Sequence, residues 1–230
     1  MKLLINFWWS IFVIAVCAHA QSNHPRWQLE ISWDYVSHGG HYAQQVLYTD
    51  FTEIIVANSE KTTFYIAATH LSALSGKLFL RYGLSLSDKG YIQDFSFINP
   101  NVGVYWEWII NRQLYFLGTP VLLSYNTYKK QRKWNGYIEA GLIPELLISN
   151  KRGQEIPVFN NIEYRFKSMN LSGMLSGGIQ FKITDSLTFR AGPQFRWALF
   201  EYSKGTLTLP SHSIVGFRPV SIGFSGGVLF

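Results

Sequence analysis

Hydrophobic and polar residues alternate with a period of two along most of the chain. Between Trp27 and Tyr35, for example, apolar residues hold every odd position and polar residues hold every even one. Successive side chains of a β-strand point to opposite faces, so each such segment has one apolar face and one polar or small face. With two less regular apolar segments, the pattern predicts eight strands, at residues 27–36, 63–72, 77–87, 113–125, 136–148, 169–183, 187–202 and 214–230.

The stretches between these strands predict the connections. Residues 37–62 and 88–112 are predicted to be long connections, and residues 150–168 and 203–213 are predicted to be polar loops. The sequence shows no domain linker, low-complexity tract or fixed-period repeat, which favours a single domain.

The N-terminal segment has the order of a secretory signal peptide. Lys2 precedes an apolar run at residues 3–16, and the small residues of Ala-His-Ala at 18–20 form a cleavage site. The run is shorter than the roughly 20 residues of a transmembrane helix. We expect residues 1–20 to be removed and residues 21–230 to form the mature domain. The alternative is a lipoprotein signal that is acylated at Cys17.

Composition excludes several classes of protein. The chain is 47% hydrophobic, 17% aromatic and 15% charged, which argues against intrinsic disorder. Beyond residue 20 there is no apolar run of about 18 residues, so no spanning helix is expected. Cleavage would remove the one cysteine, which leaves neither a disulfide nor a Cys-based zinc site. It would also remove Lys2, leaving 19 basic and 14 acidic residues and a net charge of +5.

Alternating strands fit either a soluble barrel or sandwich, with the apolar face inside, or a transmembrane barrel, with the apolar face on lipid. The polar faces carry many glycines and charges of both signs, which fit a narrow lumen where charges can be paired. The candidate lumen network comprises Glu30, Asp34, Glu139 and Glu145 with Arg81, Arg190 and Arg196.

Aromatic residues and the last strand also favour a transmembrane barrel. Aromatic side chains cluster near strand ends, as in the girdles of membrane barrels; they are Trp27, Trp33, Tyr35, Tyr115, Tyr125, Tyr137, Phe200 and Tyr202. The last strand alternates through Phe224 and Val228 to the terminal residue Phe230. Such an ending resembles the insertion signal that the outer-membrane barrel-assembly machinery reads.

The order of segments from about residue 77 to residue 230 resembles the PorT-like outer-membrane β-barrel family. The resemblance rests on residues 78–90 (LFLRYGLSLSDKG), 115–125 (YFLGTPVLLSY) and 137–149 (YIEAGLIPELLIS), and on the terminal Phe. It does not extend to the first third, because residues 27–40 lack the Gly-rich first strand of that family. The resemblance implies an eight-stranded barrel with both termini in the periplasm, and for some members a part in a secretion and gliding apparatus.

Catalytic and metal-binding motifs are scarce. His38 and His41 could present two imidazoles from one loop, but no third ligand lies near them in the sequence, so no metal site is predicted. His212 lies between two serines, which is similar to the His and Ser of outer-membrane lipid A deacylases, although the surrounding motif is missing. We expect no cofactor and no enzyme activity, with a lipid-modifying barrel enzyme as one alternative.

Charge in the connections bears on partners. Lys129, Lys130, Arg132 and Lys133 form a basic run between two predicted strands. Nucleic acid is an implausible partner for an exported protein, so the run would face solvent, periplasmic proteins or lipid headgroups.

These observations predict an all-β protein, a transmembrane antiparallel up-and-down β-barrel of about eight strands in the bacterial outer membrane. Because side chains fill a barrel of this size, it is not expected to be an open general porin. The expected role is structural or in assembly, including service in a secretion apparatus. The expected partners are outer-membrane lipid, the barrel-assembly machinery during insertion, and secretion-system or periplasmic proteins. The remaining alternative is a soluble periplasmic barrel that binds an apolar ligand.

Overall fold

The computed structural model describes residues 26–38, 47–49, 52–99, 104–127, 133–152, 162–207 and 218–230. All regular elements in these ranges are β-strands, and none contains a helix long and apolar enough to cross a membrane. The elements are β1 Arg26–His38, β2 Leu47–Thr49, β3 Thr52–Ser59, β4 Lys61–Ser75, β5 Leu78–Asp88, β6 Tyr91–Asn99, β7 Val104–Gly118, β8 Val121–Asn126, β9 Trp134–Arg152, β10 Ile162–Phe166, β11 Met169–Lys182, β12 Thr188–Ala198, β13 Ser203–Leu207 and β14 Pro219–Leu229.

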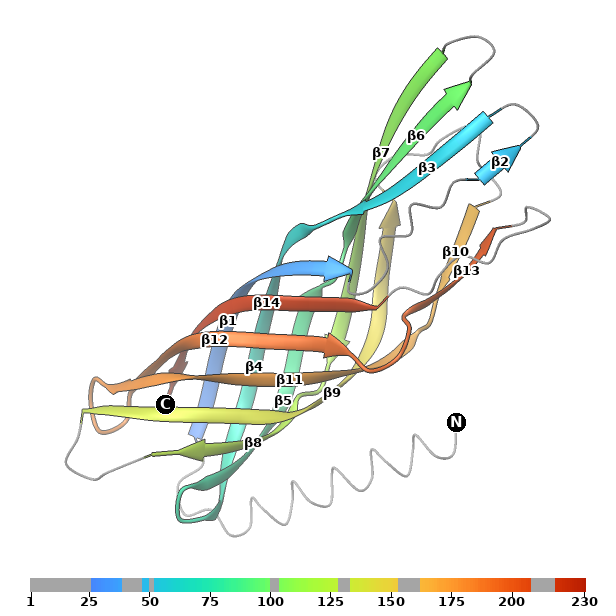
Figure 1. The fold of residues 1–230 in the computed structure, drawn as a ribbon. Helices are drawn as coiled ribbons and strands as arrows, with labels where there is room; N and C mark the ends of the chain where they lie inside the picture. Colours follow the sequence, from blue (N-terminus) through green and yellow to red (C-terminus); the bar gives the residue numbers. More distant parts are fainter. Residues whose placement is uncertain are drawn as a thin grey trace, which may run out of the picture.

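Eight strand positions close into an antiparallel barrel (Figure 1). Its order is β1, β4, β5, β7 with β8, β9, β11, β12 and β14, and β14 pairs with β1 to close the ring. Neighbours in the ring follow one another along the chain, so the topology is up-and-down. This confirms the fold predicted from the alternation. The fourth position is split between β7 and β8 at Thr119–Pro120, where proline lacks the N–H that a ladder needs.

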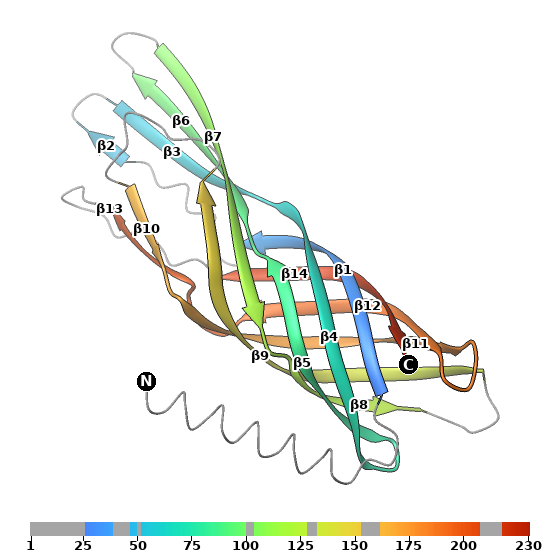
Figure 2. The same cartoon turned by 180° about the vertical axis from the view of Figure 1, so that it is seen from behind.

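The two ends of the barrel differ. At one end, which we call the turn end, the connections are short: Gly76–Lys77, residues 127–133 and residues 183–187. Gly76 has a φ of +50°, a backbone conformation that glycine adopts without a side-chain clash. At the other end, which we call the loop end, the strands continue past the barrel (Figures 1 and 2).

Strands beyond the barrel correct the predicted connections. The segments predicted as long connections contain β2, β3, β6 and the first half of β7, which pair in the order β2-β3-β6-β7. The predicted polar loops contain β10 and β13, which pair with each other. The β2–β3 and β6–β7 pairs are hairpins, whereas β3–β6 and β10–β13 join segments far apart in sequence. Strand formation depends on such pairing, which local alternation does not report.

Candidate functional site

The barrel interior holds the predicted charged residues. The structure places all seven there, and each is at most 6% exposed: Glu30, Asp34, Arg81, Glu139, Glu145, Arg190 and Arg196. They come from four strands, β1, β5, β9 and β12. Their side chains point inward because each lies on the polar face of an alternating strand. The candidate site is therefore the lumen, and its geometry decides what it can do.

Arg81 on β5 is the centre of the ion pairs. It donates to Glu30 on β1 at 2.5 Å and to Glu139 on β9 at 2.6 Å. Its Nε donates to Thr69 Oγ1 on β4 at 2.9 Å. One guanidinium thus links four strands around the barrel wall, using the planar fork of donors that suits arginine to paired carboxylates.

Arg190 on β12 completes the pairing of Glu139. It donates to Glu139 Oε1 at 2.8 Å and to Gln28 Oε1 at 2.5 Å. Gln28 in turn donates to Glu30 Oε2 at 2.8 Å. The guanidinium carbon lies 3.7 Å from the ring centroid of Tyr137, a cation–π contact on the inner wall.

The third arginine extends this network toward the loop end. Arg196 donates to Asp34 on β1, which also accepts from Ser32 at 2.6 Å. With its amide oriented to satisfy both neighbours, Gln194 donates to Glu30 at 2.9 Å and accepts from Arg196 Nε at 3.1 Å. We call the connected set the turn-side network; it comprises Gln28, Glu30, Ser32, Asp34, Thr69, Arg81, Glu139, Arg190, Gln194 and Arg196.

The charges of the turn-side network balance, with three arginines against three carboxylates. Removing charges from water is costly, and the attraction between them offsets this cost only when the geometry is good and further hydrogen bonds are made. Here each carboxylate accepts from at least two donors, such as Ser176 to Glu139 at 3.3 Å in addition to both arginines. The network can thus hold the walls in place without any bound ion.

Glu145 belongs to a second polar cluster, and its partner is not one of the three arginines. Lys89, between β5 and β6, donates to Glu145 at 2.7 Å and to Ser172 Oγ and Tyr202 Oη at 2.8 Å each. Ser172 also donates to Glu145 at 2.8 Å, and the Tyr202 hydroxyl donates to the same carboxylate. We call Lys89, Glu145, Ser172 and Tyr202 the loop-side cluster.

Sequence reasoning missed Lys89 and Tyr202 as lumen residues. Lys89 lies between β5 and β6, outside any strand, and Tyr202 follows the end of β12 at Ala198. Tyr202 was predicted to be an outward aromatic of a girdle, but it is fully buried and packs on Phe116. Tyr137 also faces inward, because it shares the inner face of β9 with Glu139.

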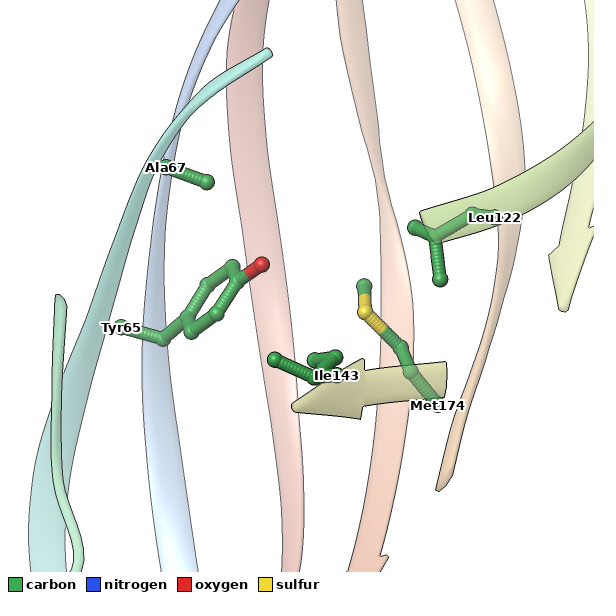
Figure 3. Close-up of a cluster of buried hydrophobic side chains, with 5 residues drawn as sticks. All are labelled: Tyr65, Ala67, Leu122, Ile143 and Met174. Atoms are coloured by element: carbon green, nitrogen blue, oxygen red, sulfur yellow. The ribbon is translucent and has the colours of Figure 1, made fainter. Parts of the chain in front are cut away.

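An apolar cluster lies between the two polar ones. Figure 3 shows its members, Tyr65, Ala67, Leu122, Ile143 and Met174, which are at most 1% exposed and come from opposite parts of the wall. Along β9, Ile143 stands between Glu139 and Glu145, and along β11, Met174 stands between Ser176 and Ser172. We call these five residues the apolar plug. The lumen is thus filled by a polar layer, an apolar layer and a second polar cluster.

The outer wall is apolar. Exposed large hydrophobic side chains lie on every strand position of the barrel, for example Leu29 at 52%, Leu84 at 59%, Ile179 at 55% and Ile222 at 62% exposed. A large apolar surface around a polar interior suits lipid and not water. The chain is a transmembrane β-barrel.

The comparisons with known proteins concern only the type of fold and do not identify a family. No family model and no curated protein sequence matches the chain. Among solved structures it is similar to Neisserial surface protein A (11% identity, TM-score 0.48, 89% of this chain and 95% of that one). It is also similar to the outer membrane protein OprG from Pseudomonas aeruginosa (10% identity, TM-score 0.45, 90% and 97%) and to the outer membrane protein AlkL (13% identity, TM-score 0.42, 91% and 92%). At these identities none of them assigns an activity to this barrel.

Five of the eight aromatic residues predicted for the girdles are exposed on the outer wall, and the residues of the predicted insertion signal lie there too. Trp27, Trp33, Tyr35, Tyr125 and Phe200 are between 44% and 63% exposed. In the last strand, Phe224 and Phe230 are 60% and 50% exposed, and Val228 is partly exposed on the same face. The backbone of Phe230 exchanges hydrogen bonds with that of Trp27, at 2.7 and 2.8 Å.

The structure describes only some of the residues on which the histidine hypotheses depend. His41 and His212 lie outside the described residues, as do Lys129, Lys130 and Arg132 of the basic run. His38 ends β1. Across the described ranges, no group of three or more His, Cys, Asp or Glu side chains is arranged to hold a metal ion.

Proposed function

We propose that this protein is an integral barrel of the bacterial outer membrane with a structural or assembly role, and that it does not conduct solutes as an open porin. The observation that supports this most directly is the filled lumen. Ion pairs, hydrogen bonds and the apolar plug occupy the interior, with Arg81, Leu122, Ile143 and Met174 all fully buried. A solute would have to displace paired charges and packed apolar groups to cross.

The strands beyond the barrel suggest where such a role would be performed. Membrane barrels of this kind have short periplasmic turns and longer loops outside the cell. On that orientation, β2, β3, β6 and the first half of β7 extend on the external side (Figure 1). A rigid barrel that carries protruding strands can hold them at a fixed place for a partner to contact. The resemblance to the PorT-like family, which includes proteins of a secretion apparatus, is consistent with a partner of that kind.

Gel mobility and conductance test this proposal together. A closed membrane barrel resists detergent at room temperature, so the unboiled protein from the membrane pellet should migrate differently from the boiled protein. The refolded protein in a planar lipid bilayer should add no steady conductance. A protein found in the soluble periplasm without a boiling-dependent shift would overturn the membrane assignment, and stable open channels would overturn the closed lumen.

Two alternatives remain testable. A lipid-modifying enzyme would require His212, so lipid A should be unchanged in composition when His212→Ala replaces the wild type if the structural role holds. A soluble barrel with an apolar ligand inside would require an apolar interior, and the described interior carries six ion-paired carboxylate and arginine side chains in the turn-side network alone. The second alternative therefore conflicts with the geometry.

A further inference from the structure

Charged residues at the turn end are arranged around the rim of the barrel. Arg26 begins β1, Lys77 lies in the turn between β4 and β5, Lys133 precedes β9, and Lys182 ends β11. In ring order the cations lie at β1, at the turn between β4 and β5, at β9 and at β11, with β8 between β5 and β9, so they are spread over six of the eight strand positions. We call Arg26, Lys77, Lys133 and Lys182 the basic collar.

The basic collar is held in register by the strand ends. The Lys77 carbonyl accepts from the Asn126 amide at 2.9 Å, and the Lys133 carbonyl accepts from the Lys182 amide at 2.9 Å. Arg26, Lys77 and Lys133 are exposed residues. Lys182 instead pairs with Asp185 at 2.5 Å, and Asp185 is the one acidic residue among the described residues of the turn end. Arg26, Lys77 and Lys133 therefore share the described turn end with a single acidic side chain, which is paired with Lys182.

Exposed aromatic residues lie next to the basic collar on the lipid-facing wall. Trp27 follows Arg26 and is 52% exposed, and Trp134 follows Lys133 and is 58% exposed. Trp134 also packs on Phe181, with ring centroids 4.5 Å apart. Tryptophan at such a position sits at the level of lipid headgroups. The cations thus stand at headgroup depth.

The loop end shows no such excess of positive charge. The sequence of the loop-end segments 39–61, 88–112, 151–168 and 199–218 carries nine acidic and nine basic residues. The connection between β8 and β9 at the turn end adds three further basic residues to the sequence, outside the described residues, and no acidic one. The excess of basic residues is therefore found at the turn end of the barrel and not at both ends.

We infer that the basic collar binds the headgroups of anionic glycerophospholipids in the leaflet at the turn end, and that it enriches them around the barrel. The inference rests on the proposed function, because it requires a barrel that spans the membrane. A basic residue near an anionic membrane surface favours association by roughly fivefold, and the effect is screened by salt. The exposed cations supply the charge, and the adjacent tryptophans fix its depth.

Quenching of tryptophan fluorescence by brominated lipids tests this inference. The refolded full-length protein is placed in phosphatidylcholine vesicles that contain either brominated phosphatidylglycerol or brominated phosphatidylcholine at the same mole fraction. At low salt, quenching by the anionic lipid should be the stronger, with a relative association constant above that of phosphatidylcholine by roughly tenfold. The preference should decline as salt is added.

Matched variants decide whether the basic collar is responsible. The triple variant Arg26→Gln, Lys77→Gln, Lys133→Gln should lose most of the preference. The control Lys151→Gln, Arg218→Gln, which removes two exposed cations from the loop-end side, should retain it. Each variant is first shown to be inserted by its boiling-dependent gel shift, so failure of the membrane barrel is distinguished from failure of the collar. No preference in the inserted wild type, or an equal loss in both variants, would overturn the inference.

Discussion

The two polar clusters of the lumen are built from different parts of the chain. The turn-side network takes its members from within barrel strands, where inward positions are fixed by alternation. The loop-side cluster joins Glu145 and Ser172 on strands to Lys89 and Tyr202, which lie in connecting segments outside the strands. The first cluster is therefore a property of the barrel wall. The second ties the wall to the segments that lead out of it.

This difference also separates what each cluster holds together. Arg81 links β1, β4, β5 and β9, so its loss would loosen the wall itself. Lys89 and Tyr202 anchor the starts of β6 and β13, which carry the chain beyond the barrel. The apolar plug lies between the clusters, and Arg196 of the turn-side network packs on it, with its guanidinium carbon 4.3 Å from the ring centroid of Tyr65. We therefore expect Arg81 and Lys89 to contribute to stability independently, and coupling between the clusters to pass through Arg196 and Asp34.

The largest expected effect comes from breaking the turn-side network at its centre. Arg81→Met leaves Glu30 and Glu139 buried with one guanidinium fewer, and should lower the free energy of unfolding by about 4 kcal/mol. Urea unfolding of the refolded protein in lipid, followed by tryptophan fluorescence, measures this. The double variant Arg81→Met, Glu30→Gln restores the balance of charge and should recover part of the loss. A double variant as unstable as the sum of the single ones would contradict the pairing.

A smaller effect is expected from the apolar plug. Ile143→Ala opens a cavity in a fully buried cluster and should cost about 3 kcal/mol in the same unfolding assay. The matched control is Ile138→Ala on the same strand, where the side chain is 54% exposed on the outer wall and lipid can fill the space. Equal losses at the two positions would mean that the interior of the barrel is not packed as described.

The loop-side cluster should tolerate change better than the centre of the turn-side network does. Lys89→Met removes the cation that pairs with the buried Glu145, which keeps hydrogen bonds from Ser172 and Tyr202, so we expect a loss of about 3 kcal/mol. A double-mutant cycle with Tyr202→Phe should give a coupling of about 1 kcal/mol, because both side chains bind the same carboxylate. The cycle of Lys89→Met with Arg81→Met should give a coupling below about 0.5 kcal/mol. Strong coupling in the second cycle would show that the apolar plug does not separate the clusters.

The smallest effect is expected at the turn end. The hydrogen bond from Lys182 lowers the pKa of the Asp185 carboxyl, which lies in a fully exposed turn. A depressed pKa stabilises the folded state above the unfolded pKa, and this contribution is lost as the pH falls through the folded pKa. Because the pair is solvated, Asp185→Asn should leave the unfolding midpoint unchanged. An NMR titration of the Asp185 carboxyl should show the shift disappear in Lys182→Gln.

The contrast between the turn-side network and the loop-side cluster also explains how much of this structure the sequence predicts. Alternation identified six of the eight barrel positions, and two less regular apolar segments, 63–72 and 113–125, supplied the others. Alternation also identified the inward charges such as Glu30 and Arg190, because period-two patterning reports the face on which a residue lies. It could not assign partners, since pairing depends on how strands are staggered around the ring. Glu145, for instance, meets Lys89 rather than an arginine. Residues outside strands, such as Lys89, have no alternating pattern by which to be assigned. Tyr202 was included in the predicted strand 187–202, but β12 ends at Ala198.

The closing pair of strands has a kinetic consequence. Seven of the eight barrel seams join strands that are neighbours along the chain, and each can form as a local hairpin. The eighth joins β1 to β14, with Trp27 bonded to Phe230. Contacts between residues far apart in sequence form slowly because a long loop must close first. β1 therefore keeps an unpaired edge until β14 is in place. The barrel closes in the membrane only when these two strands pair.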